Sequence, residues 1–335
     1  MNWVNQTNVL QPPGAHMRSS VAATTFPQGI LFIGGHTISP PSGGSLGRAG
    51  DSYYFTSATG WQKVQSPTVP DQLGRTDTAI AYDAKNARFI VFSGLGESGT
   101  LPGSTWALTS ATTASAAWTQ ILPAGGGNPT QRYAHAMTYH PGRESVIMVG
   151  GFAGTYGSST FAAEAWELRN GAWSPICGSP PAGGCPFSGR AYLGLTYDAL
   201  RAVIVMFGGQ FGVGTQSLGL SGETWELDLA TTPTWTNRTP VDVTKSPAGR
   251  SRVGLAYHPG RQTVIAHGGS SDGSNPRSDT WEWNGTCWTQ LPGTPPPAYN
   301  YRTGFAYSPG HGGVVAIGGT LSDNTTPVPD VSYGQ

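Results

Sequence analysis

A repeated unit constrains the fold more than any other feature of this sequence. Each unit holds an apolar run that ends in Gly-Gly or Ser-Gly, and the closing glycines are Gly35, Gly94, Gly151, Gly209, Gly269 and Gly319. The intervals between them are 59, 57, 58, 60 and 50 residues. The clearest copies are RYAHAMTYHPGRESVIMVGG, from Arg132 to Gly151, and RSRVGLAYHPGRQTVIAHGG, from Arg250 to Gly269. The same small structure is therefore expected six times.

Four short strands are expected in each unit. A tight turn joins the first two apolar runs, a Gly/Ser-rich loop follows the glycine, and an aromatic strand comes next: DSYYF, STWAL, EAWEL, ETWEL, DTWEW or DVSY. A fourth run begins near a tryptophan in most units. A long period with four strands is the pattern of a propeller blade. The 49 glycines and 27 prolines suit the many turns that this fold needs, so we expect one all-β domain over residues 1–335.

The two ends of the chain complement each other. The N-terminal segment NWVNQTNVLQPPGAHMR resembles WTQILPAGGGNPTQR, which starts at Trp118, yet it precedes the first unit. The last unit stops at DVSYGQ without a fourth strand. The sequence therefore predicts a six-bladed β-propeller in which residues 1–10 supply the outer strand of the blade formed by residues 300–335. Such closure removes both free sheet edges.

With these marks the chain resembles the kelch family of β-propellers. The marks are an Arg that opens the inner strand, a Gly doublet after the second, an acid before an aromatic residue in the third, and a Trp in the fourth. The resemblance implies the fold but no single activity, because kelch propellers include ubiquitin-ligase adaptors, copper oxidases, a mutarotase and iron-dependent specifier proteins. The thioether-linked Tyr and Cys of the oxidases and the iron-binding spacing of the specifiers have no counterpart in this sequence.

Strand alternation predicts two unlike faces. Connections from the second to the third strand, and from the fourth strand to the next unit, are long and share one face, the long-loop face. The connections between first and second strands are short, as in YDAKNAR and YHPGRE, and lie on the opposite, tight-turn face. Long loops on a rigid scaffold commonly carry binding and catalysis. We therefore expect the functional site on the long-loop face.

An arginine opens most inner strands at this face. The aligned residues are Arg18, Arg75, Arg132, Arg190 and Arg250; the sixth unit has Asn300 there and Arg302 two residues later. The kelch resemblance implies that they rim the channel mouth, where they would attract a carboxylate, phosphate or sulfate. The structural alternative is pairing with the recurring third-strand acids Asp51, Glu164, Glu223, Asp279 and Asp330.

Side chains that break the repeat near the axis are candidates for function. Two residues after the arginine position, Asp77, Tyr192, Arg252 and Arg302 replace the small residues Ser20 and Ala134. We predict Arg252 and Arg302 as further ligand-binding residues. If the site is catalytic, Asp77 and Tyr192 are the predicted catalytic groups.

Four histidines are the predicted metal ligands: His16, His36, His135 and His267. A zinc or other divalent transition metal held there would activate water near neutral pH, as in a metal-dependent hydrolase of phosphoesters, lactones or esters. The alternative is that His135 and His267 are hydrogen-bonded within their blades. The other three, His140, His258 and His311, fall in tight turns and are expected to be solvated.

The predicted function is recognition of a small molecule with an anionic group, with the metal-dependent hydrolase as its catalytic version. The alternative is a non-catalytic protein or glycan interaction module that uses the loops alone. Equal numbers of basic and acidic residues, 18 each, give no field for nucleic acid, and no apolar run is long enough to span a membrane. We expect a monomer.

Cysteine usage bears on the compartment. Cys177 and Cys185 flank the turn-rich segment GSPPAGG and either form a disulfide or remain two thiols. The start MNWVNQTNVLQPPG lacks the pattern of a signal peptide, so none is expected in this chain. Together these features lean towards an extracellular or periplasmic protein without fixing its location.

Overall fold

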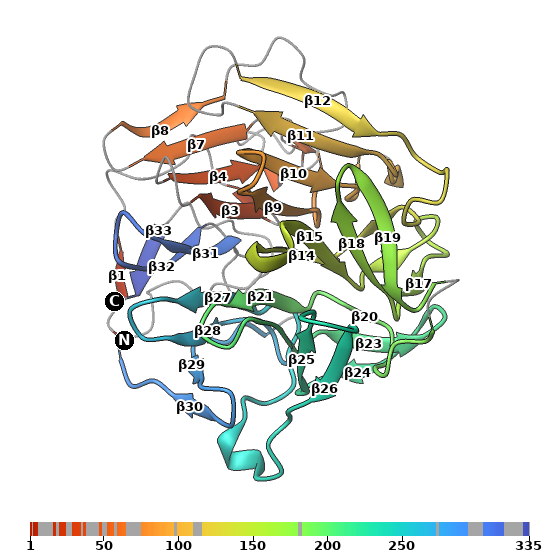
Figure 1. Ribbon diagram of the computed structural model, residues 1–335. Helices are drawn as coiled ribbons and strands as arrows, with labels where there is room; N and C mark the ends of the chain where they lie inside the picture. Colours follow the sequence, from red (N-terminus) through yellow and green to blue (C-terminus); the bar gives the residue numbers. More distant parts are fainter. Residues whose placement is uncertain are drawn as a thin grey trace.

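The computed structural model describes residues 1, 3–5, 16–17, 20–24, 29–34, 36–37, 47–48, 52–56, 59–64, 75–96, 99–109, 116–179, 183–272, 275–293, 304–317 and 331–334. Within them the fold is all-β and contains several four-stranded antiparallel sheets around a common axis, consistent with a β-propeller-like fold (Figure 1). Two short 3-10 turns, η2 (Pro141–Arg143) and η3 (Val243–Lys245), interrupt the strands. The sheets take their names from the innermost strand.

Three four-stranded sheets come from the first half of the chain, with strands ordered from the axis outwards. The β3 sheet contains β3 (Ser20–Thr24), β4 (Gly29–Ile33), β7 (Ser52–Thr56) and β8 (Gly60–Lys63). The β9 sheet contains β9 (Ala79–Asp83), β10 (Arg88–Phe92), β11 (Thr105–Thr109) and β12 (Ala117–Leu122). The β14 sheet contains β14 (Ala136–His140), β15 (Ser145–Val149), β18 (Ala165–Arg169) and β19 (Ala172–Cys177).

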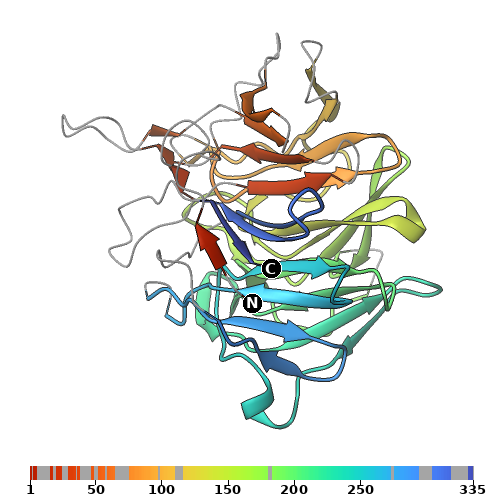
Figure 2. The same ribbon diagram turned by 90° about the vertical axis from the view of Figure 1, so that its left-hand side faces the viewer.

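The later four-stranded sheets include one that joins both chain ends. The β21 sheet contains β21 (Gly194–Asp198), β22 (Val203–Phe207), β25 (Thr224–Asp228) and β26 (Thr234–Asn237). The β27 sheet contains β27 (Gly254–His258), β28 (Thr263–His267), β29 (Thr280–Trp283) and β30 (Trp288–Gln290). The β31 sheet contains β31 (Gly304–Ser308), β32 (Gly313–Ile317), β33 (Val331–Gly334) and β1 (Trp3–Asn5). Strand β1 pairs antiparallel with β33, so the termini lie close together in both views (Figures 1 and 2).

Short strands in the long connections form three small sheets. They combine β2 (His16–Met17) with β5 (His36–Thr37) and β6 (Gly47–Arg48); β13 (Arg132–Tyr133) with β16 (Phe152–Ala153) and β17 (Thr160–Phe161); and β20 (Arg190–Ala191) with β23 (Gln210–Val213) and β24 (Gln216–Leu220). Each joins the segment that enters an inner strand to the connection that follows the glycine of the same unit. These small sheets give the long-loop face an ordered framework.

The core lies between neighbouring sheets. Second strands such as β22 (VIVMF) are apolar throughout, and β15 (SVIMV) is apolar after its first residue, because both of their faces are covered. Buried clusters join each four-stranded sheet to the next along the chain, and a cluster of Ile30, Phe32, Val315 and Ile317 joins the β31 sheet to the β3 sheet.

The recurring tryptophans also connect sheets. Trp173 in β19 donates through its indole N–H to the Thr105 hydroxyl of the preceding sheet at 2.9 Å, and Trp288 in β30 does the same to Thr224 at 2.8 Å. A buried indole needs such a partner for its N–H. Their recurrence in the sequence therefore reflects packing between sheets.

A disulfide joins Cys177 at the end of β19 to Cys185, with 5.0 Å between the two Cα atoms. The structure thus favours the first of the two alternatives left open by the sequence. The third cysteine, Cys287, is a free thiol. Within the described residues no helix is long and apolar enough to cross a membrane.

Candidate functional site at the channel mouth

Three of the predicted ring arginines are buried and bound to acids. Arg132, Arg190 and Arg250 have side chains that are 0%, 1% and 2% exposed. They pair with Glu164, Glu223 and Asp279 at 2.6, 2.7 and 2.6 Å. Burial raises the pKa of Asp279, but hydrogen bonds from Arg250 and Trp281 outweigh it and leave that pKa below its usual value. These are the pairs that the structural alternative expected.

The same arginines fix the backbone around them. In each case the guanidinium Nε donates to the carbonyl two residues earlier, and Nη1 donates to the carbonyl of the first glycine of the doublet. Arg250, for example, donates to the carbonyls of Ala248 and Gly268 at 3.1 Å each. A guanidinium with several fixed donors suits this task better than an ammonium group. The repeated arginine thus holds the start of an inner strand against the end of the second strand.

The glycine doublets are required where neighbouring sheets meet. Gly151 donates its N–H to the Arg190 carbonyl at 2.8 Å, and Gly209 donates to the Arg250 carbonyl at 2.8 Å. Gly150 has a φ of +68°, and a Cβ there would lie 2.4 Å from the Arg190 carbonyl oxygen. A side chain at this position would therefore push two sheets apart.

The residues that follow the arginines by two positions share one unusual backbone conformation. Asp77, Ala134, Tyr192 and Arg252 have φ values of 52°, 57°, 56° and 59°. Each non-glycine residue in this region is strained by its Cβ. Their backbones form a chain of hydrogen bonds near the axis. The N–H of Ala134 donates to the backbone carbonyl of Asp77, the N–H of Tyr192 to the carbonyl of Ala134, and the N–H of Arg252 to the carbonyl of Tyr192, at 2.6 to 2.8 Å. The strain is thus offset by direct links between four neighbouring sheets.

Tyr192 and Arg252 form a stacked pair at the end of this chain of bonds. The Arg252 guanidinium carbon lies 3.9 Å from the centre of the Tyr192 ring, and both side chains are partly exposed. A guanidinium stacked on a ring keeps its N–H groups directed sideways. Asp77, the other predicted catalytic residue, is also partly exposed at the equivalent position of the β9 sheet.

A polar cavity lies beside the stacked pair. Its volume is about 490 Å³, and its lining includes Gln210 and Ser217 of the β23–β24 hairpin, Ser251, Ser271 and Asp272. The Arg252 Nη1 atom is 3.5 Å from the hydroxyl of Ser251, which lines the cavity, although Arg252 itself is not one of the lining residues. A volume between 300 and 1,000 Å³ is usual for small-molecule sites.

The carboxylate of Asp272 serves its own loop. It accepts hydrogen bonds from the Ser270 hydroxyl at 3.4 Å and from the Asn275 backbone N–H at 2.6 Å, and it also binds the Asn275 side chain. Its negative charge therefore binds Ser270 and Asn275, on either side of Ser271 and Asp272 in the cavity lining.

His135 and His267 lie in different interfaces between sheets. The His135 ring meets Phe92 edge-on at 5.8 Å, between the β9 and β14 sheets. His267 shares a hydrogen bond with the Thr280 hydroxyl at 2.9 Å and stacks on Phe305 at 6.0 Å, between the β27 and β31 sheets. Burial lowers the pKa of His135 to about 3 and that of His267 to about 4, so both rings are neutral near pH 7. The structure does not bring these two predicted metal ligands together.

The expected solvation of the turn histidines is wrong for His140 and His258. These side chains are only 5% and 6% exposed, and each Nδ1 accepts a backbone N–H of its own turn, from Arg143 and Arg261. In the neighbouring units Asp83 and Asp198 accept turn N–H groups in the same way. The histidine is thus one of two side chains that close this turn. His311 is partly exposed and bonds Ser308.

Some predicted site residues lie outside the described part of the chain. Arg18, Arg302 and the acids Asp51 and Asp330 are among them, and for His16 and His36 only the backbone strands are described. Arg75 is described and buried: its Nη1 donates to the Ser93 carbonyl at 2.6 Å, and burial lowers its pKa to about 9. Within the described residues no group of three or more His, Cys, Asp or Glu side chains could hold a metal ion.

The sequence interpretation missed the residues that build the polar cavity. Gln210, Ser217 and Ser271 come from connections that differ in length and composition from unit to unit. The available signal was the segment QFGVGTQSLGL after Gly209, which alternates like a strand pair inside an expected loop. It forms the β23–β24 hairpin.

Comparison with known proteins adds no family. No family model matches this chain, and no curated protein matches it either.

Proposed function

We propose that the chain is a six-bladed β-propeller of the kelch type, closed by its own N-terminal strand. Pairing of β1 with β33 supports the closure, and the buried cluster between the β31 and β3 sheets supports a continuous ring. The Arg–acid pairs and glycine doublets supply a physical reason for the repeated residues. Deleting residues 1–10 should lower the melting temperature sharply, because a strand pairing is lost. An unchanged melting curve would contradict this architecture.

The function that the geometry supports best is recognition of a small polar molecule that carries an anionic group, on the long-loop face. The observation that carries this proposal is the Arg252–Tyr192 stack, whose guanidinium contacts Ser251, a residue that lines the polar cavity. Arg252 supplies charged donors for the anionic group, while Gln210, Ser217 and Ser271 offer groups that can bind hydroxyls or amides. Arg302, which the sequence places in the adjacent unit, is proposed as a second contact.

The buried arginines have a smaller part in this proposal than the sequence suggested. The guanidinium N–H groups of these arginines already donate to acids and carbonyls, as those of Arg132, Arg190 and Arg250 do. A ligand would have to replace these hydrogen bonds. Their acids are more exposed than they are, up to 43% for Glu223. Recognition therefore falls to the side chains that depart from the repeat.

Binding of matched probes tests the proposal. Benzoate and phenyl phosphate, compared with uncharged benzamide, would be titrated against the protein by calorimetry. Arg252→Ala should weaken anion binding roughly 10- to 150-fold, as expected for one lost charged hydrogen bond. Arg169→Ala, which removes an exposed arginine near the tight-turn face, is the matched control and should change nothing. Equal binding of benzoate and benzamide would overturn the proposal.

The catalytic version makes this site a metal-dependent hydrolase, with Asp77 and Tyr192 as acid–base groups and His16 and His36 among the ligands. Metal analysis of protein purified without added metal tests it. Stoichiometric zinc or another divalent metal that is lost in His36→Ala would support it, together with loss of ester or lactone hydrolysis. Full activity in metal-free protein would exclude it.

A protein or glycan interaction module is the second candidate. Exposed apolar side chains on the long-loop face favour it: Tyr156, Val213 and Leu218 are 52%, 69% and 53% exposed. Replacing Val213 and Leu218 by Ser should leave benzoate binding unchanged if the small-molecule site operates alone. A partner whose binding is lost in that variant and retained in Arg252→Ala would favour the module.

A further inference from the structure

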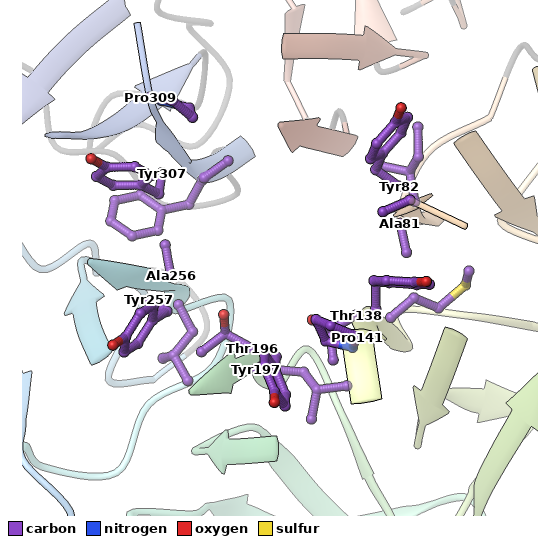
Figure 3. A pocket seen from close by; sticks show the side chains of 18 residues that line it. Ala81, Tyr82, Thr138, Pro141, Thr196, Tyr197, Ala256, Tyr257, Tyr307 and Pro309 are labelled. Carbon is purple, nitrogen blue, oxygen red and sulfur yellow. The ribbon is translucent and has the colours of Figure 1, made fainter. Parts of the chain in front are cut away.

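A second cavity opens along the axis on the opposite, tight-turn face. Its volume is about 510 Å³, and its walls come from β9, β14, β21, β27 and β31 and from the turns that follow them. Thr138, Thr196, Ala81 and Ala256 surround the opening, and tyrosines stand further from its centre (Figure 3). Pro141 and Pro309 in the turns belong to the lining, so the cavity reaches the surface there.

The cavity wall is uncharged. None of the described residues that line it is acidic, basic or a histidine. The nearby carboxylates of the turns are held elsewhere: Asp83 pairs with Arg88 at 3.0 Å and Asp198 with Arg201 at 2.7 Å. Burial also raises the pKa of the phenol of Tyr82, which therefore stays neutral at physiological pH. A charged molecule would lose hydration here without gaining a counter-charge.

The other end of the cavity is narrowed by backbone. The hydrogen bonds that link Asp77, Ala134, Tyr192 and Arg252 run across four neighbouring sheets on the long-loop side of the inner strands. Residues joined by such bonds have Cα atoms about 5 Å apart, so their chain forms a tight arc around the axis. Along these four sheets a molecule in the cavity would meet backbone on the long-loop side, whereas the tight-turn face is open.

Hydrogen-bonding groups are nevertheless present inside. β9, β14 and β21 end their sheets and bond a neighbouring strand on one edge only, so the peptide groups of the other edge face the axis. The hydroxyls of Thr138 and Thr196 lie at the opening (Figure 3). Apolar walls with a few polar groups are the usual make-up of a site for a small neutral molecule.

We propose that this axial cavity is a second binding site, which takes a small uncharged molecule with an aromatic or aliphatic body and at least one hydroxyl or amide. It is independent of the site proposed at the channel mouth, because ligands enter it from the opposite face. The tyrosines around it recur because five of the six units place one before the tight turn: Tyr82, Tyr139, Tyr197, Tyr257 and Tyr307.

Saturation-transfer NMR with p-cresol and toluene as probes, and with benzylammonium as a charged counterpart, tests the inference. The neutral probes should receive saturation from the protein. The double variant Thr138→Phe/Thr196→Phe fills the opening and should weaken p-cresol binding at least about tenfold. Thr119→Phe adds the same ring to an exposed position of β12 and should leave it unchanged, as should Arg252→Ala.

Absence of saturation on both neutral probes would overturn the inference, and so would unchanged p-cresol binding in the folded double variant. If the double variant does not melt cooperatively, Thr138→Phe alone serves, because one ring already narrows the opening. The same loss of p-cresol binding is expected there. Undiminished binding in a folded Thr138→Phe protein would show that the probe binds elsewhere and that the cavity holds only water.

Discussion

On the long-loop face charged side chains gather close to the axis, whereas on the tight-turn face the axis opens into an uncharged cavity. Both faces are made by the same unit. On the first face the repeat changes from unit to unit, with Asp77, Tyr192 and Arg252 at one position. On the second face five of the six units keep a tyrosine before the turn. The proposed polar site thus lies where the repeat varies, and the axial cavity lies where most units keep the same residue.

Arg250 and Arg252 show the same contrast within three residues. Arg250 is buried and bonded to Asp279 and to the carbonyls of Ala248 and Gly268. Arg252 is partly exposed and lies on Tyr192. The difference separates an arginine whose hydrogen bonds hold the scaffold together from one that stacks on a partly exposed ring.

The largest expected effect is on the scaffold arginine. Arg250→Ala leaves Asp279 without its buried partner and should lower the free energy of unfolding by about 3 to 5 kcal/mol. Arg252→Ala removes a stacked guanidinium and should lower it by about 0.5 to 1 kcal/mol. Urea denaturation of both variants measures the contrast. Similar losses of unfolding free energy in the two variants would contradict the distinction between a scaffold role for Arg250 and a role at the channel mouth for Arg252.

A smaller effect is expected where the sheets touch. Gly150→Ala places a Cβ 2.4 Å from the Arg190 carbonyl oxygen, whereas Gly125→Ala, at a φ of +79°, meets no atom within 4 Å. Both variants carry the strain of a positive φ, about 1 to 2 kcal/mol. Gly150→Ala should lose about 1 to 3 kcal/mol more, since it also forces the sheets apart. Equal denaturation midpoints would mean that the doublet is not a point of close contact.

A further predicted effect is the acid sensitivity caused by buried histidines. With folded pKa values of about 3 and 4, His135 and His267 stay neutral while the unfolded chain takes up protons below pH 6.5. Stability is therefore present above pH 6.5 and falls as the pH drops towards 4, by about 2 kcal/mol for each histidine at pH 5.

Matched variants isolate this contribution from that of the carboxylates. His267→Phe copies Phe207 and His135→Leu copies Leu193, the residues at the same positions of the fourth unit. Melting temperatures between pH 7.5 and 5 should fall less steeply for each variant than for the parent protein. Parallel curves would show that these rings are protonated in the folded state.

Structural features that recur at fixed positions of the repeat could be predicted from the sequence. Features that depend on partners distant in the sequence could not. Pairing of Arg132, Arg190 and Arg250 with third-strand acids could be expected, because both members return at fixed positions. Solvation of His140 and His258 was the wrong expectation, since their turns use an imidazole nitrogen where other units use a carboxylate. The axial cavity could not be predicted, because it is assembled from five units and no single segment marks it. For the polar cavity the sequence marked the β23–β24 segment but not its partners from later connections.

The difference between the faces can be tested most directly by crossing two probes with two variants. Benzoate and p-cresol would each be titrated against the parent protein, Arg252→Ala and Thr138→Phe/Thr196→Phe. The structure predicts that Arg252→Ala loses benzoate and keeps p-cresol, and that the cavity variant keeps benzoate and loses p-cresol. Loss of both probes in the same variant, or of neither in both, would contradict the assignment of polar recognition to one face and neutral binding to the other.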